Sequence, residues 1–447
     1  MVRRFVPACL VLALAGALAR DAAANGRPPA TASITFRQGH DSDVAVGLTF
    51  GLLVSHDSGN SWEWICEDAI GYSGPFDPKY AFASSGALFA STFNGLRVMR
   101  DSCTFDATPL GSALIATDLF GPDQTLYAAA SQQSDPGHGI AADFNVYRST
   151  NDGKTFPTKG QPPGDVSWWQ SLAIAPSDAQ RLYLSGYRFV ENTPGAGTRK
   201  EQVLFRSDTG GASWTELSLA ELDPQPMQNS LIDIAGISKT DADHVYLRIE
   251  AEDDQTTESI YRSTDKGAHW TKILHTTVPI PAFLVRANGD LIAGTQALGT
   301  QISHDDGMTW MPLDGAPHMN CLVENSAHEL WACTQNFGSP VVPSDDAGIM
   351  KTTDLVNWTK VLRYQDLQNP VTCAAGTIQR DTCATLWCGV CQQLGCTPPA
   401  SYGCVADAPP PPAKGGCCDG SPGGPGALAL GLAIGTLLLR PRRRVVS

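Results

Sequence analysis

The stretch Ser55-His56-Asp57-Ser58-Gly59-Asn60-Ser61-Trp62 decides the fold predicted for this chain, because its pattern S-x-D-x-G-x-x-W recurs along the sequence. Near-complete copies begin at Ser149, Ser207, Ser263 and Ser303, and degenerate copies lie at 100–105 and 352–358. We call each copy a motif turn. The seven copies recur about every 50 residues, a period typical of propellers and solenoids.

Each motif turn has a local structural explanation. The acidic position accepts hydrogen bonds from its own turn, and the glycine supplies the positive φ that closes it. Because this position repeats in every copy, we expect it to be structural rather than catalytic. The residues concerned are Asp57, Asp101, Asn151, Thr209, Asp265, Asp305 and Asp354. The same reasoning applies to the arginines in phase with the turns, Arg100, Arg148, Arg206 and Arg262.

Alternating apolar segments precede every motif turn, such as 44–48 and 51–54 before the first. Period-2 patterning between turn residues is typical of β-strands. We therefore predict an all-β fold, a seven-bladed β-propeller of four strands per blade over residues 26–368, closed into a ring that hides its strand edges.

The motif turns resemble Asp-box (BNR) repeats, so the chain is similar to the Asp-box propeller family. In that family the turn lies at the blade periphery. Its sialidases carry an Arg-Ile-Pro segment before the first repeat and have six blades, whereas the corresponding region here reads Ile34-Thr-Phe-Arg-Gln-Gly-His40. We therefore expect no sialidase activity. Seven-bladed members include xyloglucan-cleaving glycosidases, a photosystem II assembly factor and the sortilin ectodomain.

Both chain ends predict export. Residues 1–24 combine two arginines, an apolar run and small residues, the layout of a secretory signal peptide, with a buried core helix as the alternative. Residues 407–418 form a Pro/Gly linker ending in Cys417-Cys418, and residues 419–447 contain an apolar stretch closed by arginines. This tail resembles the MYXO-CTERM sorting signal, which implies attachment at the cell surface. An ordinary membrane anchor is the alternative.

Ten cysteines lie outside the signal peptide and the Cys417-Cys418 pair, and export makes disulfides the expectation. They are Cys66, Cys103, Cys321, Cys333, Cys373, Cys383, Cys388, Cys391, Cys396 and Cys404. Cys321 and Cys333 fall on adjacent predicted strands and should pair, which leaves Cys66 for Cys103. The other six lie in a predicted cysteine-rich segment, 369–406. A short apolar helix is predicted farther along the chain, in the tail. A zinc site at Cys388 and Cys391 is the alternative, but we expect no metal and no cofactor.

Charge excludes one class of partner. The formal net charge is −14, and residues 22–418 alone carry about −19, because the two ends contain seven arginines and only two aspartates. An acidic surface repels phosphate backbones, so we expect no binding of nucleic acid. Charged residues are only 17% of the chain, which argues against a coiled coil or a charged disordered protein.

The candidate functional residues favour binding over catalysis. Asp233 and Asp118 on predicted innermost strands could serve a glycoside hydrolase, but no second acid is in phase with either. Long loops are predicted opposite the motif turns, at 131–143, 187–200, 251–258 and 335–346, where binding surfaces usually lie. Trp168 and Trp169 could stack on a ligand there, although at least one of them could instead pack beneath the loop.

We therefore expect a monomeric, non-catalytic propeller, displayed at the cell surface, that binds a polysaccharide or a protein. A glycoside hydrolase is the first alternative. An assembly factor for a membrane protein is the second.

Overall fold

The computed structural model describes residues 27–72, 76–160, 162, 166, 168–191, 197–222, 230–250 and 257–398. The chain divides into two compact units, Met1–Pro411 and Pro412–Ser447, and all described residues belong to the first. The predicted signal peptide, linker and tail lie outside the described residues, as do Cys404, Cys417 and Cys418. No helix within the described ranges is long and apolar enough to cross a membrane.

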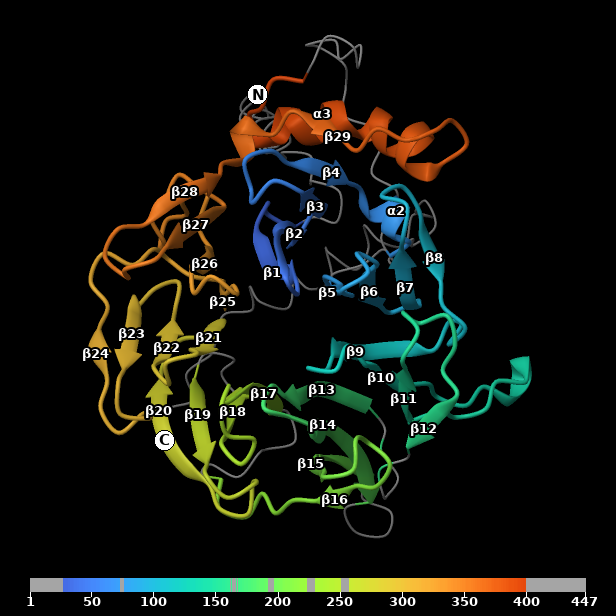
Figure 1. The fold of residues 1–447 in the computed structure, drawn as a ribbon, viewed down its shortest axis with the longest axis vertical. Coiled ribbons are helices and arrows are strands. Elements are labelled where there is room, and N and C mark those ends of the chain that lie inside the picture. The colour runs from blue at the N-terminus through green and yellow to red at the C-terminus, as the bar shows by residue number, and fades with distance from the viewer. Residues whose placement is uncertain are drawn as a thin grey trace, which may run out of the picture. The chain divides into compact units, whose positions relative to one another are not determined.

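The described strands form seven sheets arranged around a central axis as the blades of a propeller (Figure 1). We number the sheets in chain order. Sheet 1 holds β1 (Thr31–Arg37), β2 (His40–Leu48), β3 (Gly51–Ser55), β4 (Glu63–Ile65) and β29 (Asn369–Pro370). Sheet 2 holds β5 (Lys79–Phe82), β6 (Leu88–Thr92), β7 (Gly95–Met99) and β8 (Phe105–Ala107). Sheet 3 holds β9 (Leu114–Phe120), β10 (Leu126–Ser131), β11 (Val146–Ser149) and β12 (Thr158–Gly160). Sheet 4 holds β13 (Trp168–Ala175), β14 (Asp178–Glu191), β15 (Thr198–Ser207) and β16 (Thr215–Glu216).

The remaining sheets repeat this order, with the first strand nearest the axis (Figure 1). Sheet 5 holds β17 (Leu231–Ile237), β18 (Val245–Glu250), β19 (Glu258–Ser263) and β20 (Thr271–Thr276). Sheet 6 holds β21 (Ala282–Val285), β22 (Leu291–Gly294), β23 (Thr300–Ser303) and β24 (Met311–Pro312). Sheet 7 holds β25 (Cys321–Glu324), β26 (Leu330–Cys333), β27 (Ile349–Thr352) and β28 (Thr359–Leu362).

The expected pattern of four strands in every blade is met by six sheets and is wrong for sheet 1. There the short strand β29, which follows sheet 7 in the chain, pairs in parallel with β4 as a fifth strand. An unpaired outer strand exposes backbone donors and acceptors that invite aggregation, and β29 covers them.

Residues 369–398 continue this cover, and we call them the clasp. The N–H of Val371 and the side-chain amide of Gln379 both donate to the backbone carbonyl of Trp64, at 3.0 and 2.8 Å. The clasp then forms a π-helical turn (Gln379–Cys383) and helix α3 (Ala384–Leu394). Trp387 of α3 is fully buried against Trp64, with ring centroids 5.2 Å apart. The clasp thus extends the core of sheet 1 (Figure 1).

Two disulfides fasten the clasp to the start of the ring. Cys66 pairs with Cys383 and Cys103 with Cys373, across 317 and 270 residues of sequence. The predicted Cys66–Cys103 pair is therefore wrong, because each of these cysteines faces the clasp rather than the neighbouring sheet.

The other described cysteines are also disulfide-bonded. The predicted Cys321–Cys333 pair joins adjacent strands of sheet 7. Cys391 pairs with Cys396, and Cys388 is disulfide-bonded as well. The zinc alternative at Cys388 and Cys391 is wrong, because a disulfide sulfur cannot supply the thiolate that zinc binds.

The motif turns connect the third and fourth strands of the sheets and share one hydrogen-bonding scheme. In the first, the Ser55 hydroxyl donates to Asp57 at 2.8 Å and accepts from the N–H of Gly59 at 2.9 Å. The Asp57 carboxylate accepts from the N–H of Ser61 at 2.8 Å. Equivalent side-chain acceptors close the other turns, at Asp101, Asn151, Thr209, Asp265, Asp305 and Asp354. All seven positions therefore serve their own turn.

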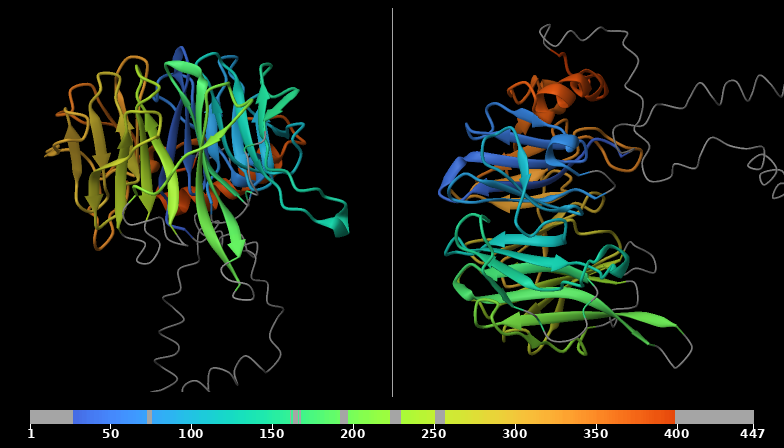
Figure 2. Two further views of the ribbon diagram at one scale, coloured as in Figure 1. Left: turned by 90° about the horizontal axis from the view of Figure 1, so that it is seen from below. Right: turned by 90° about the vertical axis from the view of Figure 1, so that its right-hand side faces the viewer.

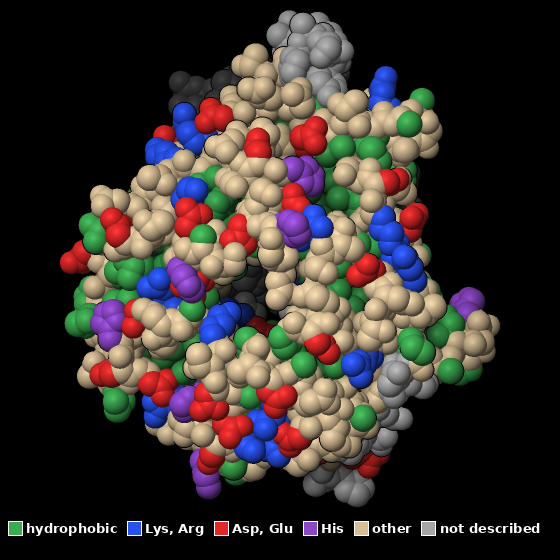
Figure 3. All heavy atoms as spheres, in the orientation of Figure 1, with side chains coloured by type: hydrophobic (Ala, Val, Ile, Leu, Met, Phe, Trp, Pro, Cys, Tyr) green, Lys and Arg blue, Asp and Glu red, His purple; other side chains and the backbone are tan. Residues whose placement is uncertain are grey.

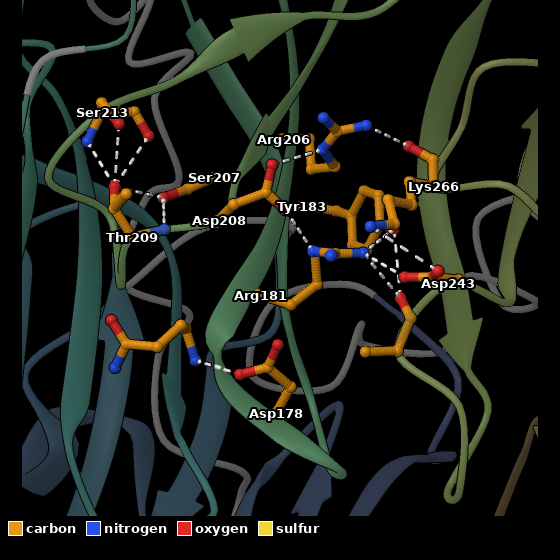
Figure 4. Close-up of polar contacts among 12 residues, drawn as sticks. Asp178, Arg181, Tyr183, Arg206, Ser207, Asp208, Thr209, Ser213, Asp243 and Lys266 are labelled. Carbon is orange, nitrogen blue, oxygen red and sulfur yellow. Dashed lines mark hydrogen bonds and ion pairs between the residues drawn. The ribbon is translucent and has the colours of Figure 1, made fainter.

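Arginines in phase with the turns link neighbouring sheets. Arg100, Arg206 and Arg262 each donate to the carbonyl of a residue in the next motif turn, namely Asp152, Lys266 and Asp306. Each of those three residues has a positive φ, between 55° and 68°. Figure 4 shows the Arg206–Lys266 contact beside a second bridge, in which Arg181 pairs with Asp208 at 2.5 Å and Asp243 at 2.8 Å. These arginines hold sheets together rather than converging on one site.

The ring has two different faces. The motif-turn face carries the seven turns. Acidic, basic and histidine side chains are interspersed around its opening (Figure 3). The long-loop face, opposite, carries the connections between second and third strands. The β14–β15 hairpin and the β10–β11 connection, which contains the short helix Pro136–His138, extend well beyond the ring (Figure 2).

Candidate functional site

Large apolar side chains are exposed chiefly on the long-loop face. Most exposed hydrophobic residues lie in its connections or strand ends: Phe76, Phe93, Ile140, Phe189, Leu298, Phe337 and Val341. Contiguous exposed apolar area on a soluble protein marks an interaction site. The long-loop face is therefore the candidate functional surface.

Five aromatic residues form a row across this face, which we call the aromatic strip. Phe76 and Phe93 have ring centroids 5.1 Å apart, and Phe93 and Trp168 lie 6.0 Å apart. Trp168 pairs directly with Tyr187 on the neighbouring strand, which places both side chains on one side of sheet 4. The ring centroids of Tyr187 and Phe189 lie 5.6 Å apart.

The strip combines residues that are far apart in the sequence and that lie on different elements or beside them. Phe76 precedes β5, Phe93 is at the tip of the β6–β7 hairpin, and Trp168 begins β13. Tyr187 lies on β14 opposite the first residue of β13, and Phe189 lies beyond it, on the part of β14 that pairs only with β15. The outermost rings are the most open, with Phe76 62% and Phe189 56% exposed. A ligand can thus stack along the strip from the ring to the projecting hairpin.

Of the two predicted tryptophans, the structure assigns only Trp168 to this surface. Trp169 is fully buried, its indole N–H donates to the carbonyl of Phe144 at 3.1 Å, and its ring meets Phe205 edge-on. The prediction that Trp169 binds ligand is therefore wrong. Neighbouring residues in a strand point to opposite sides, so only one of the two can face outward.

The predicted acids do not come together. Asp233 begins β17 at the long-loop face, whereas Asp118 is near the end of β9, close to the β9–β10 turn at the motif-turn face. Asp233 is also held by Arg248, at 2.6 Å. A hydrolase needs two carboxyl groups flanking one bond. Asp118 lies on sheet 3 and Asp233 on sheet 5, with sheet 4 between them.

A different carboxyl group stands out beside the strip. Glu67 is in the first turn of the short helix α2 (Glu67–Ile70), and burial raises the pKa of its carboxyl to about 7. Asp77, next to Phe76 in the chain, is held by Arg27 through two hydrogen bonds of 2.6 and 2.9 Å. The charge of Arg27 lowers the pKa of Glu67 and the charge of Asp77 raises it, and both effects are smaller than that of burial. Sequence reasoning missed this group, because nothing in the local pattern marks Glu67 as buried.

Acidic groups also cluster at the long-loop end of sheet 5. Arg248 lies between Asp233 and Glu250, the latter at 3.1 Å. Burial raises the pKa of Glu250 and of Glu258, whose carboxylate accepts from the N–H of Ile280. Within the described ranges no group of three or more His, Cys, Asp or Glu side chains is arranged to hold a metal ion.

Comparison with known proteins gives partial similarities. No family model matches the sequence. A xyloglucanase of Paenibacillus sp is 27% identical over 187 residues, which is 36% of this chain and 16% of that enzyme. Among solved structures, an ancestral GH74 enzyme has a TM-score of 0.48 at 16% identity, over 68% of this chain and 44% of that one. The extracellular domain of a two component system from B. thetaiotaomicron has a TM-score of 0.48 at 12% identity, over 70% and 38%. The chain thus spans less than half the length of each of these proteins.

Proposed function

We propose that this protein is an exported β-propeller that binds a polysaccharide through the aromatic strip on its long-loop face, without catalysing a reaction. The observation that carries the proposal is the contact row from the exposed Phe76 and Phe93 to the half-buried Trp168, continued by Tyr187 and Phe189. Aromatic rings with little conformational freedom supply large contact area at low entropic cost, as ligand anchors require.

The state of the acids supports binding over hydrolysis. The carboxylate of Asp233 is occupied by Arg248, and Asp118 lies toward the other face. On the motif-turn face, arginines are engaged with acids in pairs such as Arg262–Asp306 and Arg181–Asp208. Those pairs stabilise contacts within the ring. The exposed aromatic rings of the long-loop face are therefore the better candidate for contact with a ligand.

Export is supported by the disulfides of the ring and the clasp, such as Cys66–Cys383 and Cys321–Cys333, since such bonds persist in oxidising compartments. We propose that the motif turns are Asp-box repeats, that residues 1–24 direct secretion, and that residues 407–447 attach the chain to the cell surface as a MYXO-CTERM-like tail. Detection of the mature protein on intact cells, and its loss when 419–447 are deleted, tests this placement.

Affinity electrophoresis against a panel of soluble polysaccharides tests the binding proposal. We expect one or more of them to retard the purified chain, and W168A to bind about tenfold more weakly or worse, because a central anchor is removed. M308A is the matched control, since Met308 is 73% exposed on the motif-turn face. Absence of retardation on every polysaccharide, or equal loss in W168A and M308A, would contradict the proposal. Specific capture of a protein instead would favour the assembly-factor alternative.

Glycoside hydrolysis is the second candidate, because two carboxyl groups with different surroundings lie beside Phe76. Glu67, whose raised pKa of about 7 suits a general acid, and Asp77, whose carboxyl group is paired with Arg27, are two carboxyl groups in different surroundings, as glycosidic cleavage uses. The partial similarity to a xyloglucanase also favours it. Release of reducing sugars that is abolished in both E67Q and D77N, with binding retained, would establish hydrolysis.

A further inference from the structure

We infer that the polysaccharide bound at the aromatic strip is acidic, and that its uronate carboxylates pair with cations that lie beside the rings. This inference rests on the proposed polysaccharide binding and names its ligand class. The cations are Arg97 and Lys79, near the contact between Phe76 and Phe93, and Lys200, at the ring of Tyr187.

Arg97 is held between the two segments that carry Phe76 and Phe93. It lies on β7, the second strand of the hairpin whose tip bears Phe93. Its guanidinium packs against Gly71, where an added Cβ would lie 2.8 Å from the guanidinium carbon. Gly71 ends α2 and begins the connection that contains Phe76, and its carbonyl accepts from the side-chain amide of Asn94 at 3.3 Å. Arg97 therefore lies at the base of both ring-bearing segments.

The guanidinium of Arg97 has no counter-ion in the part of the chain that the structure describes. The side chain is partly buried, and its Nε is buried without a hydrogen-bond partner. By contrast, Arg27, Arg188 and Arg248 on the same face are each paired with a carboxylate, at 2.6 to 2.7 Å. Burying a charged donor without a partner costs free energy, and a carboxylate of a ligand, which fits the planar guanidinium, would recover it.

Lys79 and Lys200 extend the positive charge along the strip. Lys79 is exposed, begins β5 three residues after Phe76, and forms no ion pair with a described residue. Lys200 lies opposite Phe189 on the β14–β15 hairpin, and its ammonium is 4.6 Å from the centre of the Tyr187 ring. Cations thus accompany the rings toward both ends of the strip, which suits a polymer with repeated carboxylates.

The acids beside the strip do not cancel this charge. Asp77 is paired with Arg27, and Glu201 is paired with Arg188. Burial raises the pKa of Glu67 to about 7, so this carboxyl carries only part of a negative charge in neutral solution. Exposed charges more than about 8 Å away are largely screened at physiological ionic strength. The cations beside the rings therefore decide the local interaction, rather than the net charge of −14.

A polyuronate matches both kinds of group on this surface. Each of its sugars presents C–H groups on the ring face, which pack on an aromatic side chain, and one carboxylate at the ring edge. Phe76 and Phe93 would take the sugar faces, and Arg97 would take a carboxylate through hydrogen bonds that are stronger than those between neutral groups. A neutral polysaccharide would leave the guanidinium without a partner.

Two pairs of polymers test the class of ligand, because the members of each pair share a backbone and differ in charge. They are polygalacturonate with its methyl ester, and alginate with its propylene glycol ester. At about 0.15 M salt, we expect calorimetry to show at least about tenfold tighter binding of the acid than of the ester in one pair or both. Equal or tighter binding of both esters would overturn the inference. If another polysaccharide binds but no polyuronate does, the inference fails while the proposed function stands.

Removing the cations one at a time tests the site. R97Q and K79Q should each weaken binding of the acid about tenfold and leave binding of the ester unchanged. R97K should retain part of the affinity, because lysine keeps the charge without the planar fork. R380Q is the matched control, since Arg380 is exposed on the clasp.

Thermal unfolding of each variant shows whether it is folded, and K79Q, at an exposed position, keeps the test decisive if R97Q is not. Equal losses in K79Q and R380Q, or equal losses for the acid and the ester, would show that these cations do not bind carboxylates.

Discussion

At the residue scale, the buried serine found in five of the seven motif turns does more for the turn than its small size implies. Ser303 is fully buried, and its hydroxyl accepts from the N–H of Gly307 at 2.8 Å while donating to Asp305. Hydrogen bonds from Thr309 lower the pKa of Asp305 to about 2, so the acceptor stays ionised. One hydroxyl thus satisfies a backbone donor and orients a carboxylate.

Replacing Ser303 by alanine should therefore destabilise the fold by about 1–3 kcal/mol, because the Gly307 N–H is left buried without a partner. Urea denaturation measures the change, with S84A at an exposed position as the control. Equal stability of S303A and the wild type would contradict this account of the turn.

Glu67 should make stability depend on pH. Because burial raises the pKa of its carboxyl from 4.5 to about 7, the folded chain holds the proton more tightly than the unfolded chain does. The contribution is complete below pH 4.5 and is lost as the pH rises through 7, by an amount on the order of 2 kcal/mol. E67Q should abolish this loss. Parallel unfolding curves of both proteins from pH 4 to 8 would show the carboxyl to be unperturbed.

Sequence reasoning at this scale identified residue types better than orientations. It predicted the seven acceptor positions because their hydrogen bonds are local. It did not separate Trp168 from Trp169, because both are large apolar residues and the side that faces the core depends on where β13 joins the ring.

At the element scale, Arg100, Arg206 and Arg262 each join two neighbouring sheets by a hydrogen bond, and we call these arginines latches. Arg262 of β19 donates to the carbonyl of Asp306 and pairs with its carboxylate at 2.9 Å. The target carbonyl belongs to a residue with a φ of 59°, so the latch also stabilises an unfavourable backbone conformation. The latches reinforce packing between sheets at the outer rim.

R262A should lower the free energy of unfolding by about 1–3 kcal/mol, since a charged hydrogen bond is lost. R262K should fall between R262A and the wild type, because lysine keeps the charge without the planar fork. Thermal unfolding of the three proteins compares them. If R262A unfolds at the same temperature as the wild type, the latch contributes nothing.

The strands were predictable at this scale because period-2 patterning and turn residues lie close together in the sequence. The strip was not predictable, because Phe76, Phe93 and Trp168 belong to elements whose contact depends on the curvature of the whole ring.

At the scale of the whole molecule, the ring is secured by the clasp. β29, Gln379 and two long-range disulfides tie the segment after sheet 7 to sheets 1 and 2. Cys66 and Cys103 were predicted to pair by elimination, because no local pattern reveals partners across 317 and 270 residues.

Replacing the four cysteines of the two disulfides between clasp and ring by serine (C66S, C103S, C373S and C383S) should destabilise the ring far more than C321S/C333S. A disulfide limits the unfolded chain more when it closes a longer loop, and the 12-residue separation of Cys321 and Cys333 gives about 3 kcal/mol on this basis. Guanidinium unfolding under oxidising conditions compares the variants. A similar loss in both would show that the clasp does not secure the ring.

Hydrogen–deuterium exchange of the full chain, with and without a saturating amount of a polysaccharide that retards it in affinity electrophoresis, tests the central claim most directly. We predict slower exchange in peptides covering residues 76–97 and 168–202, with no change in the motif turns. Protection centred on the motif turns, or unchanged exchange around the strip despite measured binding, would contradict the assignment of the ligand to the long-loop face.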